Sequence, residues 1–192
     1  MTTTTAAGQP RSALRVALRR WPILVGLGFA AFIAVGLDSG VELSKVLAAS
    51  AVVYLGAAAF ARRGAAWPVF LVTFVIIGAA NFVDFGFDPA WAVLAVGIVL
   101  LGYGLVRGAI RPAEGLPLQT LAMLGYGGAA VIALFLNPVA GSYLVAAGLL
   151  GHATWDGYHH WRQRVVARSM AEFCLVLDTA LAVTIIVLTA RA

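Results

Sequence analysis

Charged side chains are scarce in this chain. Only 11% of its 192 residues are Asp, Glu, Lys or Arg, whereas 62% are hydrophobic. A soluble domain is about a quarter charged and about half apolar, so the composition excludes an ordinary soluble fold. The apolar residues fall in runs of about 17–22, and each run is long enough to cross a bilayer core of roughly 30 Å.

Cysteine, lysine and histidine are also rare. The single cysteine, Cys174, cannot form an intramolecular disulfide. Lys45 is the sole lysine and lies near the start of an apolar run, whereas a retinal Schiff base needs a lysine in mid-membrane, so retinal is excluded. The three histidines all fall at or after residue 152 and share one helix face, which leaves no facing pair of axial ligands for a haem. There is no glycine-rich phosphate loop, so we expect no nucleotide.

Seven apolar runs predict an all-α, polytopic membrane protein with seven transmembrane helices. The predicted spans are 22–37, 42–61, 67–84, 89–107, 117–136, 139–160 and 169–190. Because the connections are short, successive helices are expected to be antiparallel. We expect residues 1–20 to form a disordered, basic cytoplasmic N-terminus and residues 21–192 to form the transmembrane domain.

Basic residues lie singly or in pairs at the ends of the apolar runs, as topology signals do. With the N-terminus inside, only Lys45 and Arg191 fall in outer segments, and the other eleven basic residues, all arginines, are inner. This bias predicts a multi-pass protein of the inner (plasma) membrane, with its N-terminus inside and its C-terminus outside. The same placement argues against nucleic acid as a partner, although the net charge is +5. Membrane lipids are the expected partners, and a homo-oligomer stays open.

The first run also has features of a signal peptide. It has a basic start, an apolar stretch and the sequence Ala34-Val35-Gly36, which a peptidase could accept. A second apolar run follows almost at once, as expected for a hairpin of retained helices. Whether the first span is cleaved is left open by the sequence.

Polar residues gather in one part of the chain, near the C-terminus. All three histidines, the single cysteine and three of the eight acids lie between residues 152 and 178. Ionisable side chains are costly inside a membrane, so such a cluster marks a candidate functional site. At about 100° per residue, His152, Asp156, His159 and His160 share one helix face, which should point into the bundle or a wet cavity.

Helical rise limits which of these side chains can share a metal ion. His152 and His159 are about 10.5 Å apart along the axis, which is too far for two bonds of about 2.1 Å to one ion. Asp156 belongs to every usable pair, because it lies one turn from His152 and close to His159 and His160. A site made of the three histidines alone is therefore disfavoured.

The seventh span must supply further ligands. In an antiparallel hairpin, Asp178 lies level with His152, and Glu172 lies level with His159. Two candidate sets follow, an inner one within the bundle and an outer one at headgroup depth. The inner set is His152, Asp156 and Asp178. The outer set is Asp156, His159, His160 and Glu172.

The inner set is the predicted catalytic and metal-binding core, with His159 and His160 as further metal ligands at its entrance. Mixed imidazole and carboxylate ligands suit zinc, iron or manganese. Such an ion could activate water, or polarise a carbonyl or phosphoryl oxygen. Without a metal, His152 between two carboxylates would be a general base or a proton relay.

Plainer interpretations stand beside these. His152 and Asp178 could hydrogen-bond only to pin two helices together. His159 and His160 could be ordinary interfacial residues, and Cys174 could serve only packing.

The joint spacing of these residues resembles that of a known family. The segment His152-x-x-Trp155-Asp156-x-x-His159-His160, followed by Cys174-x-x-x-Asp178, is similar to a motif in the last two helices of a family of small bacterial integral membrane proteins. The resemblance covers residues 152–182, and the rest of the chain matches only in hydropathy. That family has no assigned reaction, so the resemblance implies one shared motif and no activity.

Three functions are compatible with the sequence. The first is a metal-dependent enzyme that acts on a lipid or another apolar molecule from the cytoplasmic leaflet. The second is a proton-coupled transporter or carrier, with Asn81 and Asp84 near its outer mouth, although no span is clearly broken in mid-membrane by Gly or Pro. The third is a non-catalytic membrane subunit whose polar cluster ties helices together. Seven-span zinc hydrolases such as the alkaline ceramidases are a looser analogy, because their histidines are spread over distant helices.

Overall fold

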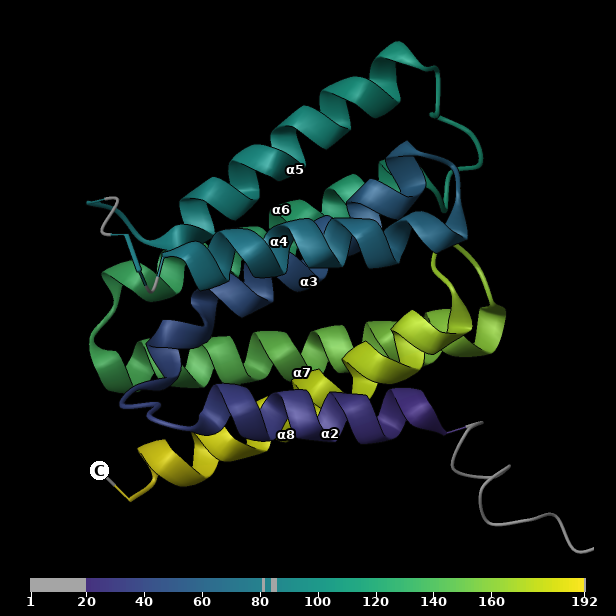
Figure 1. Cartoon of the computed structure of the whole chain (residues 1–192). Coiled ribbons are helices and arrows are strands. Elements are labelled where there is room, and N and C mark those ends of the chain that lie inside the picture. The colour runs from purple at the N-terminus through teal and green to yellow at the C-terminus, as the bar shows by residue number, and fades with distance from the viewer. Residues whose placement is uncertain (1–19, 81, 84–85, 192) are drawn as a thin grey trace, which may run out of the picture.

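A computed structural model describes residues 20–80, 82–83 and 86–191, which form a bundle of helices (Figure 1). Within these residues there are seven α-helices and two short 3-10 helices, and each predicted span overlaps one α-helix, so the all-α class is confirmed. The α-helices are α2 (Trp21–Ala34), α3 (Ser44–Ala59), α4 (Ala66–Ala79), α5 (Pro89–Val106), α6 (Leu116–Phe135), α7 (Pro138–Arg162) and α8 (Arg168–Thr189). The 3-10 helices are η1 (Gly40–Leu43) and η2 (Arg63–Ala65). The predictions for the tail before residue 20, and those for Asn81 and Asp84, lie outside the described residues.

The helices differ in length and polarity. Four segments are long and apolar enough to cross a membrane, namely Gly40–Ala59, α5, α6 and α8. Helices α2 and α4 have 14 residues each and end before the predicted spans 22–37 and 67–84 do. Helix α7 has 25 residues, but its C-terminal half carries the polar cluster and is less apolar. The structure thus confirms that the chain has helices able to span a membrane. The described residues contain four of them, whereas the sequence predicted seven.

Helix α7, which carries most of the polar cluster, has well-defined ends. The side chain of Asn137 accepts a hydrogen bond from the N–H of Ala140 at 2.9 Å, and Pro138 opens the first turn. At the other end Gln163 adopts a left-handed conformation with φ 52°, and its N–H donates to the carbonyl of His159 at 2.7 Å. The short turn that follows leads the chain into α8, which packs along α7.

Helix α3 is the central helix of the bundle. All of its residues except Lys45 are buried, and it packs against α4, α5, α6 and α7. Gly148 of α7 allows this close approach, because a Cβ there would lie 2.5 Å from a methyl carbon of Leu47. Two polar side chains of α3, Ser50 and Tyr54, are therefore enclosed by other helices and need partners inside the protein.

Helix α2 lies on the opposite side of the bundle from α5 and packs along α8 (Figure 1). Aromatic rings connect it to α4 and α8: the ring of Phe29 lies 5.7 Å from Phe70 and 5.9 Å from Phe173, between centroids. At the start of α2 and α4, the rings of Trp21 and Trp67 lie 5.5 Å apart. Phe29 and Phe70 also line a pocket between α2, α3, α4 and α8.

Candidate metal centre

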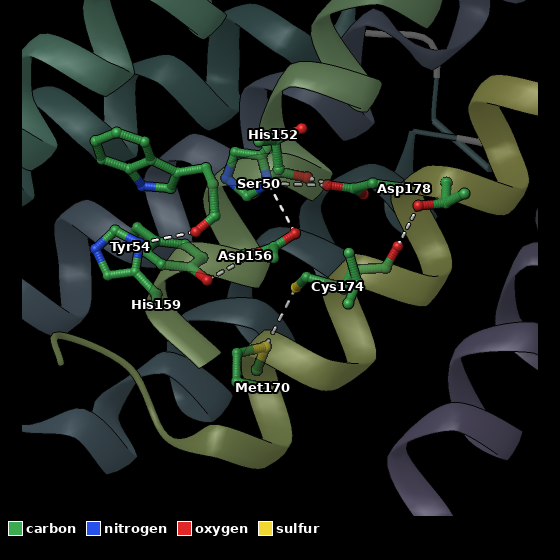
Figure 2. Close-up of polar contacts among 12 residues, drawn as sticks. Ser50, Tyr54, His152, Asp156, His159, Met170, Cys174 and Asp178 are labelled. Atoms are coloured by element: carbon green, nitrogen blue, oxygen red, sulfur yellow. Dashed lines mark hydrogen bonds and ion pairs between the residues drawn. The ribbon is translucent and has the colours of Figure 1, made fainter. Parts of the chain in front are cut away.

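Three side chains of the predicted inner set meet between α7 and α8 (Figure 2). The Nδ1 atom of His152 lies 2.9 Å from Oδ2 of Asp178 and 3.3 Å from Oδ2 of Asp156. One ligand atom from each residue lies within 4.8 Å of the other two. All three side chains are buried, with at most 1% of their surface exposed. The prediction that α8 brings Asp178 level with His152 is confirmed.

The spacing of these atoms fits a small divalent cation. Four ligands at about 2.1 Å from a tetrahedral ion lie about 3.4 Å from one another, close to the two distances around Nδ1 of His152. Two carboxylates and a neutral imidazole carry a charge of −2, which a divalent cation balances. Without one, the charge is balanced only if His152 is protonated and one of the two carboxylates also takes up a proton, because a buried unbalanced charge is costly. His152, Asp156 and Asp178 could therefore hold a metal ion.

Hydroxyl groups of the central helix orient both carboxylates. Tyr54 donates a hydrogen bond from its hydroxyl to Oδ1 of Asp156 at 2.6 Å. The hydroxyl of Ser50 lies 3.4 Å from Oδ1 of Asp178 and 3.1 Å from the carbonyl of Val46. Each carboxylate thus has one oxygen held by α3 and the other beside His152. Partners of this kind fix the direction of metal ligands and tune their affinity.

Ser50 and Tyr54 were not among the site residues predicted from the sequence. The two residues are one turn apart on the same face of an otherwise apolar span, and that spacing is the signal that could have found them. Their partners could not be named from the sequence, because nothing in it indicates that α3 is the central helix.

Two buried atoms of the cluster have no hydrogen-bond partner within the described residues. They are Nε2 of His152 and Oδ2 of Asp156. The ring of His152 is instead enclosed by Tyr54 and Tyr126, whose rings meet it edge-on at 5.2 Å each. A buried polar atom without a partner is uncommon and costs about 1–3 kcal/mol. A cation bound by Oδ2 of Asp156 would remove one of these two costs.

His159 belongs to a separate, uncharged network. Its Nδ1–H donates to the carbonyl of Trp155 at 2.9 Å, so its Nε2 is free to accept from the side-chain N–H of Gln119 at 3.3 Å. The carbonyl oxygen of Gln119 accepts in turn from the indole N–H of Trp155 at 3.3 Å. His159 is 1% exposed, so it lies in the core and not at an exposed entrance as expected. Among the described residues it is outside the group that could share an ion.

The outer predicted set is not assembled in the described part of the chain. Arg168 donates from Nε to Nε2 of His160 at 3.2 Å. Glu172 forms an ion pair with Arg20 at 3.0 Å. Asp156, which both sets shared, turns to His152 and Tyr54. Whether His159 or His160 binds metal stays a prediction, and their described contacts are with protein groups.

Cys174 lies on the pocket side of α8. Its thiol is 3.5 Å from the sulfur of Met170, and its side chain is 3% exposed. It does not join His152, Asp156 and Asp178 in the group of potential ligands, so its contacts agree with a packing role.

The pocket between α2, α3, α4 and α8 reaches the edge of this cluster. Its volume is about 830 Å³, and its lining includes Ser50, Cys174 and Leu177. Ser50 lines the pocket and also contacts Asp178, so its side chain connects the pocket wall with the site.

Comparison of the chain with family models, with curated proteins and with solved structures finds no match. The function proposed below therefore rests on the geometry of the chain itself.

Proposed function

We propose that the chain is a multi-pass membrane protein that binds a divalent metal ion through His152, Asp156 and Asp178. These ligands would suit zinc, iron or manganese, and such an ion would supply Lewis-acid chemistry toward an apolar, lipid-like substrate. The observation that carries this proposal is the buried contact of one imidazole nitrogen with two carboxylate oxygens, at 2.9 and 3.3 Å. Three protein ligands leave a fourth position of a tetrahedral ion for water or substrate.

The proposed orientation has the N-terminus inside and the C-terminus outside. It is supported by the distribution of basic residues. When successive helices are taken as antiparallel, eight of the described arginines lie beside helix ends on the same side of the bundle. They are Arg20, Arg62, Arg63, Arg107, Arg111, Arg162, Arg164 and Arg168. Only Lys45 and Arg191 flank the opposite ends. Positive charge is enriched in the loops on the cytoplasmic side of a membrane.

A lipid-like substrate is supported by what surrounds the cluster. The neighbouring pocket is lined mainly by apolar side chains of α2, α3, α4 and α8, and Ser50 belongs both to its wall and to the hydrogen-bonded surroundings of Asp178. A metal at this place would act as a Lewis acid on an oxygen of the substrate or on a bound water. Tyr54 would hold Asp156 in place through its hydrogen bond.

Metal analysis tests the proposal. The full-length protein is purified without chelator and its metal content is measured, beside the His152→Ala and His160→Ala variants. We expect about one ion per chain in the unmodified protein and in His160→Ala, and none in His152→Ala, because three-ligand sites need each of their ligands. No metal in the unmodified protein, even after addition of zinc, iron or manganese, would contradict the proposal.

Chemistry on a lipid is tested separately. The metal-loaded protein is incubated with a total membrane lipid extract, and the lipids are compared by mass spectrometry with those left by the His152→Ala variant. A lipid species that is consumed only by the unmodified protein supports an enzyme. Identical lipid profiles would restrict the proposal to metal binding.

One observation favours a second function, that of a non-catalytic subunit. The three side chains have practically no exposed surface, and hydrogen bonds from α3 already hold both carboxylates. Such a cluster could serve only to tie α3, α7 and α8 together. In that case, adding metal would not raise the unfolding temperature of the unmodified protein, whereas a true metal site stabilises the folded state as it binds.

A further inference from the structure

The pocket between α2, α3, α4 and α8 has the size of a ligand site. Its volume of about 830 Å³ falls in the range of roughly 300–1,000 Å³ that small-molecule sites occupy. Phe29, Phe70 and Val53 are typical of its lining, which is mostly apolar. A pocket of this size is too small for the whole of a two-chain phospholipid but can take one hydrocarbon chain.

One end of the pocket carries a positive charge. Lys45, the sole lysine of the chain, lies in its lining and is half-buried. Within residues 20–80, 82–83 and 86–191, the side chain of Lys45 forms no hydrogen bond or ion pair. Its ammonium group is therefore available to an anion.

An acid, Glu42, also lines this end of the pocket, but it forms no ion pair with Lys45 in the described structure. Glu42 lies one turn before Lys45, and its Oε1 accepts hydrogen bonds from the backbone N–H groups of Ser39 at 2.9 Å and Asp38 at 3.2 Å. These bonds form the capping box of η1 and direct the carboxylate toward the start of the helix.

The pocket extends from this charged end toward the interior. Lys45 and Val53 both line it and are eight residues apart on α3, which corresponds to about 12 Å along the helix. Ser50 and Cys174 lie in the lining between the charged end and the polar cluster. The pocket is thus apolar along its length, with a cation at one end.

We propose that this pocket binds an anionic, single-chain amphiphile such as a fatty acid. Its carboxylate pairs with Lys45, and its hydrocarbon chain lies against α3 between α2, α4 and α8. Close packing of the chain against the apolar lining contributes to the affinity, although inside a membrane or a micelle this packing removes no apolar surface from water. The ion pair selects an acid over a neutral lipid. This inference rests on the proposed function for its membrane setting only, since binding requires no metal.

Binding of oleate to the purified full-length protein in detergent tests the inference, with oleyl alcohol as the neutral ligand of equal chain length. We expect saturable oleate binding, and roughly tenfold weaker binding in Lys45→Gln, as for loss of a hydrogen bond to a charged group. Arg191→Gln, which removes the other cation at the same end of the bundle, should bind oleate as the unmodified protein does. Oleyl alcohol should bind weakly and equally to the unmodified protein and Lys45→Gln.

A second variant tests the position of the chain. Ala49 lines the pocket, and Ala49→Phe should fill the space and abolish binding of both ligands while the protein remains monodisperse. If this variant does not fold, competition with phosphatidylglycerol replaces it as the test. We expect this intact phospholipid to displace little of the bound oleate.

Three results would overturn the inference. They are equal affinity for oleate and oleyl alcohol, an unchanged oleate affinity in Lys45→Gln, and full displacement by phosphatidylglycerol, which would identify the occupant as a bilayer lipid. None of these results depends on the metal content of the preparation. Failure of the metal-centre proposal and failure of this one can therefore be told apart.

Discussion

His152 and His159 lie two turns apart on the same side of α7, yet their surroundings differ in charge. Around His152 the neighbours are two carboxylates, Asp156 and Asp178. Around His159 they are the neutral amide of Gln119 and the carbonyl of Trp155. Both rings are almost fully buried, so exposure does not distinguish them.

The difference shows that the neighbouring helix decides what a buried histidine can do. Helix α8 presents an acid to His152, whereas α6 presents an amide to His159. In the neutral network both ring nitrogens of His159 have hydrogen-bond partners, the carbonyl of Trp155 and the amide of Gln119. The acidic network holds two carboxylates, whose charge either a divalent cation or two protons can balance.

The largest expected effect comes from removing the two histidines in turn. His152→Ala leaves two buried carboxylates without their partner and should lower the free energy of unfolding by about 3–5 kcal/mol. His159→Ala leaves only neutral groups unpaired and should cost about 1–3 kcal/mol. Denaturant unfolding in detergent, without added metal, measures both values. Equal losses of unfolding free energy in the two variants would contradict the proposed difference between the charged network of His152 and the neutral network of His159.

A smaller effect is expected at the tyrosine that holds Asp156. Tyr54→Phe removes the hydroxyl 2.6 Å from Oδ1 of Asp156 and should weaken metal binding roughly 10- to 100-fold. Tyr126→Phe is the matched control, because the ring of Tyr126 packs on His152 and its hydroxyl contacts neither carboxylate in the described structure. Competition with a zinc-binding dye gives both affinities. The same loss in both variants would mean that the hydroxyl of Tyr54 does not act through Asp156.

The fold followed from the sequence more readily than the site did. Hydrophobic runs located all seven described helices, and an antiparallel hairpin correctly placed Asp178 level with His152. The ends of α2 and α4 were overestimated, because hydropathy alone continued the helices to residues 37 and 84.

The parts of the site that escaped prediction depend on contacts between distant helices. Ser50 and Tyr54 were not predicted, because their contacts with the carboxylates depend on the position of α3 at the centre of the bundle. Gln119 was missed because a single amide in an apolar span has no periodic signal. The burial of His159 could not be foreseen, since its position near the end of α7 is equally typical of an interfacial residue.

Substitution of Gln119 disrupts the neutral hydrogen-bonded network around His159. Gln119→Leu removes the partner of His159 Nε2 and of the indole N–H of Trp155, and should cost about 1–3 kcal/mol of unfolding free energy. Metal affinity should not change, because the charged network does not include this side chain. Thermal unfolding and zinc titration of the same preparation measure both quantities. A parallel loss of zinc affinity would show that the two networks act as one.

The smallest effect is expected at His160. His160 is partly buried near the end of α7, and its described hydrogen bond comes from the exposed Arg168, so His160→Ala should change the unfolding free energy by less than about 1 kcal/mol. Unfolding of this variant beside His159→Ala compares two adjacent histidines. A loss of unfolding free energy as large as that of His159→Ala would contradict this expectation and would mean that His160 also takes part in contacts that stabilise the fold.

The central claim is that one imidazole and two carboxylates share a single ion. X-ray absorption spectroscopy of the zinc-loaded protein tests it most directly, because it reports the ligand atoms around the metal. We predict one imidazole nitrogen and two or three oxygens at about 2.0–2.2 Å, with no sulfur. Two or more imidazoles, or a zinc–sulfur distance of about 2.3 Å, would contradict the account.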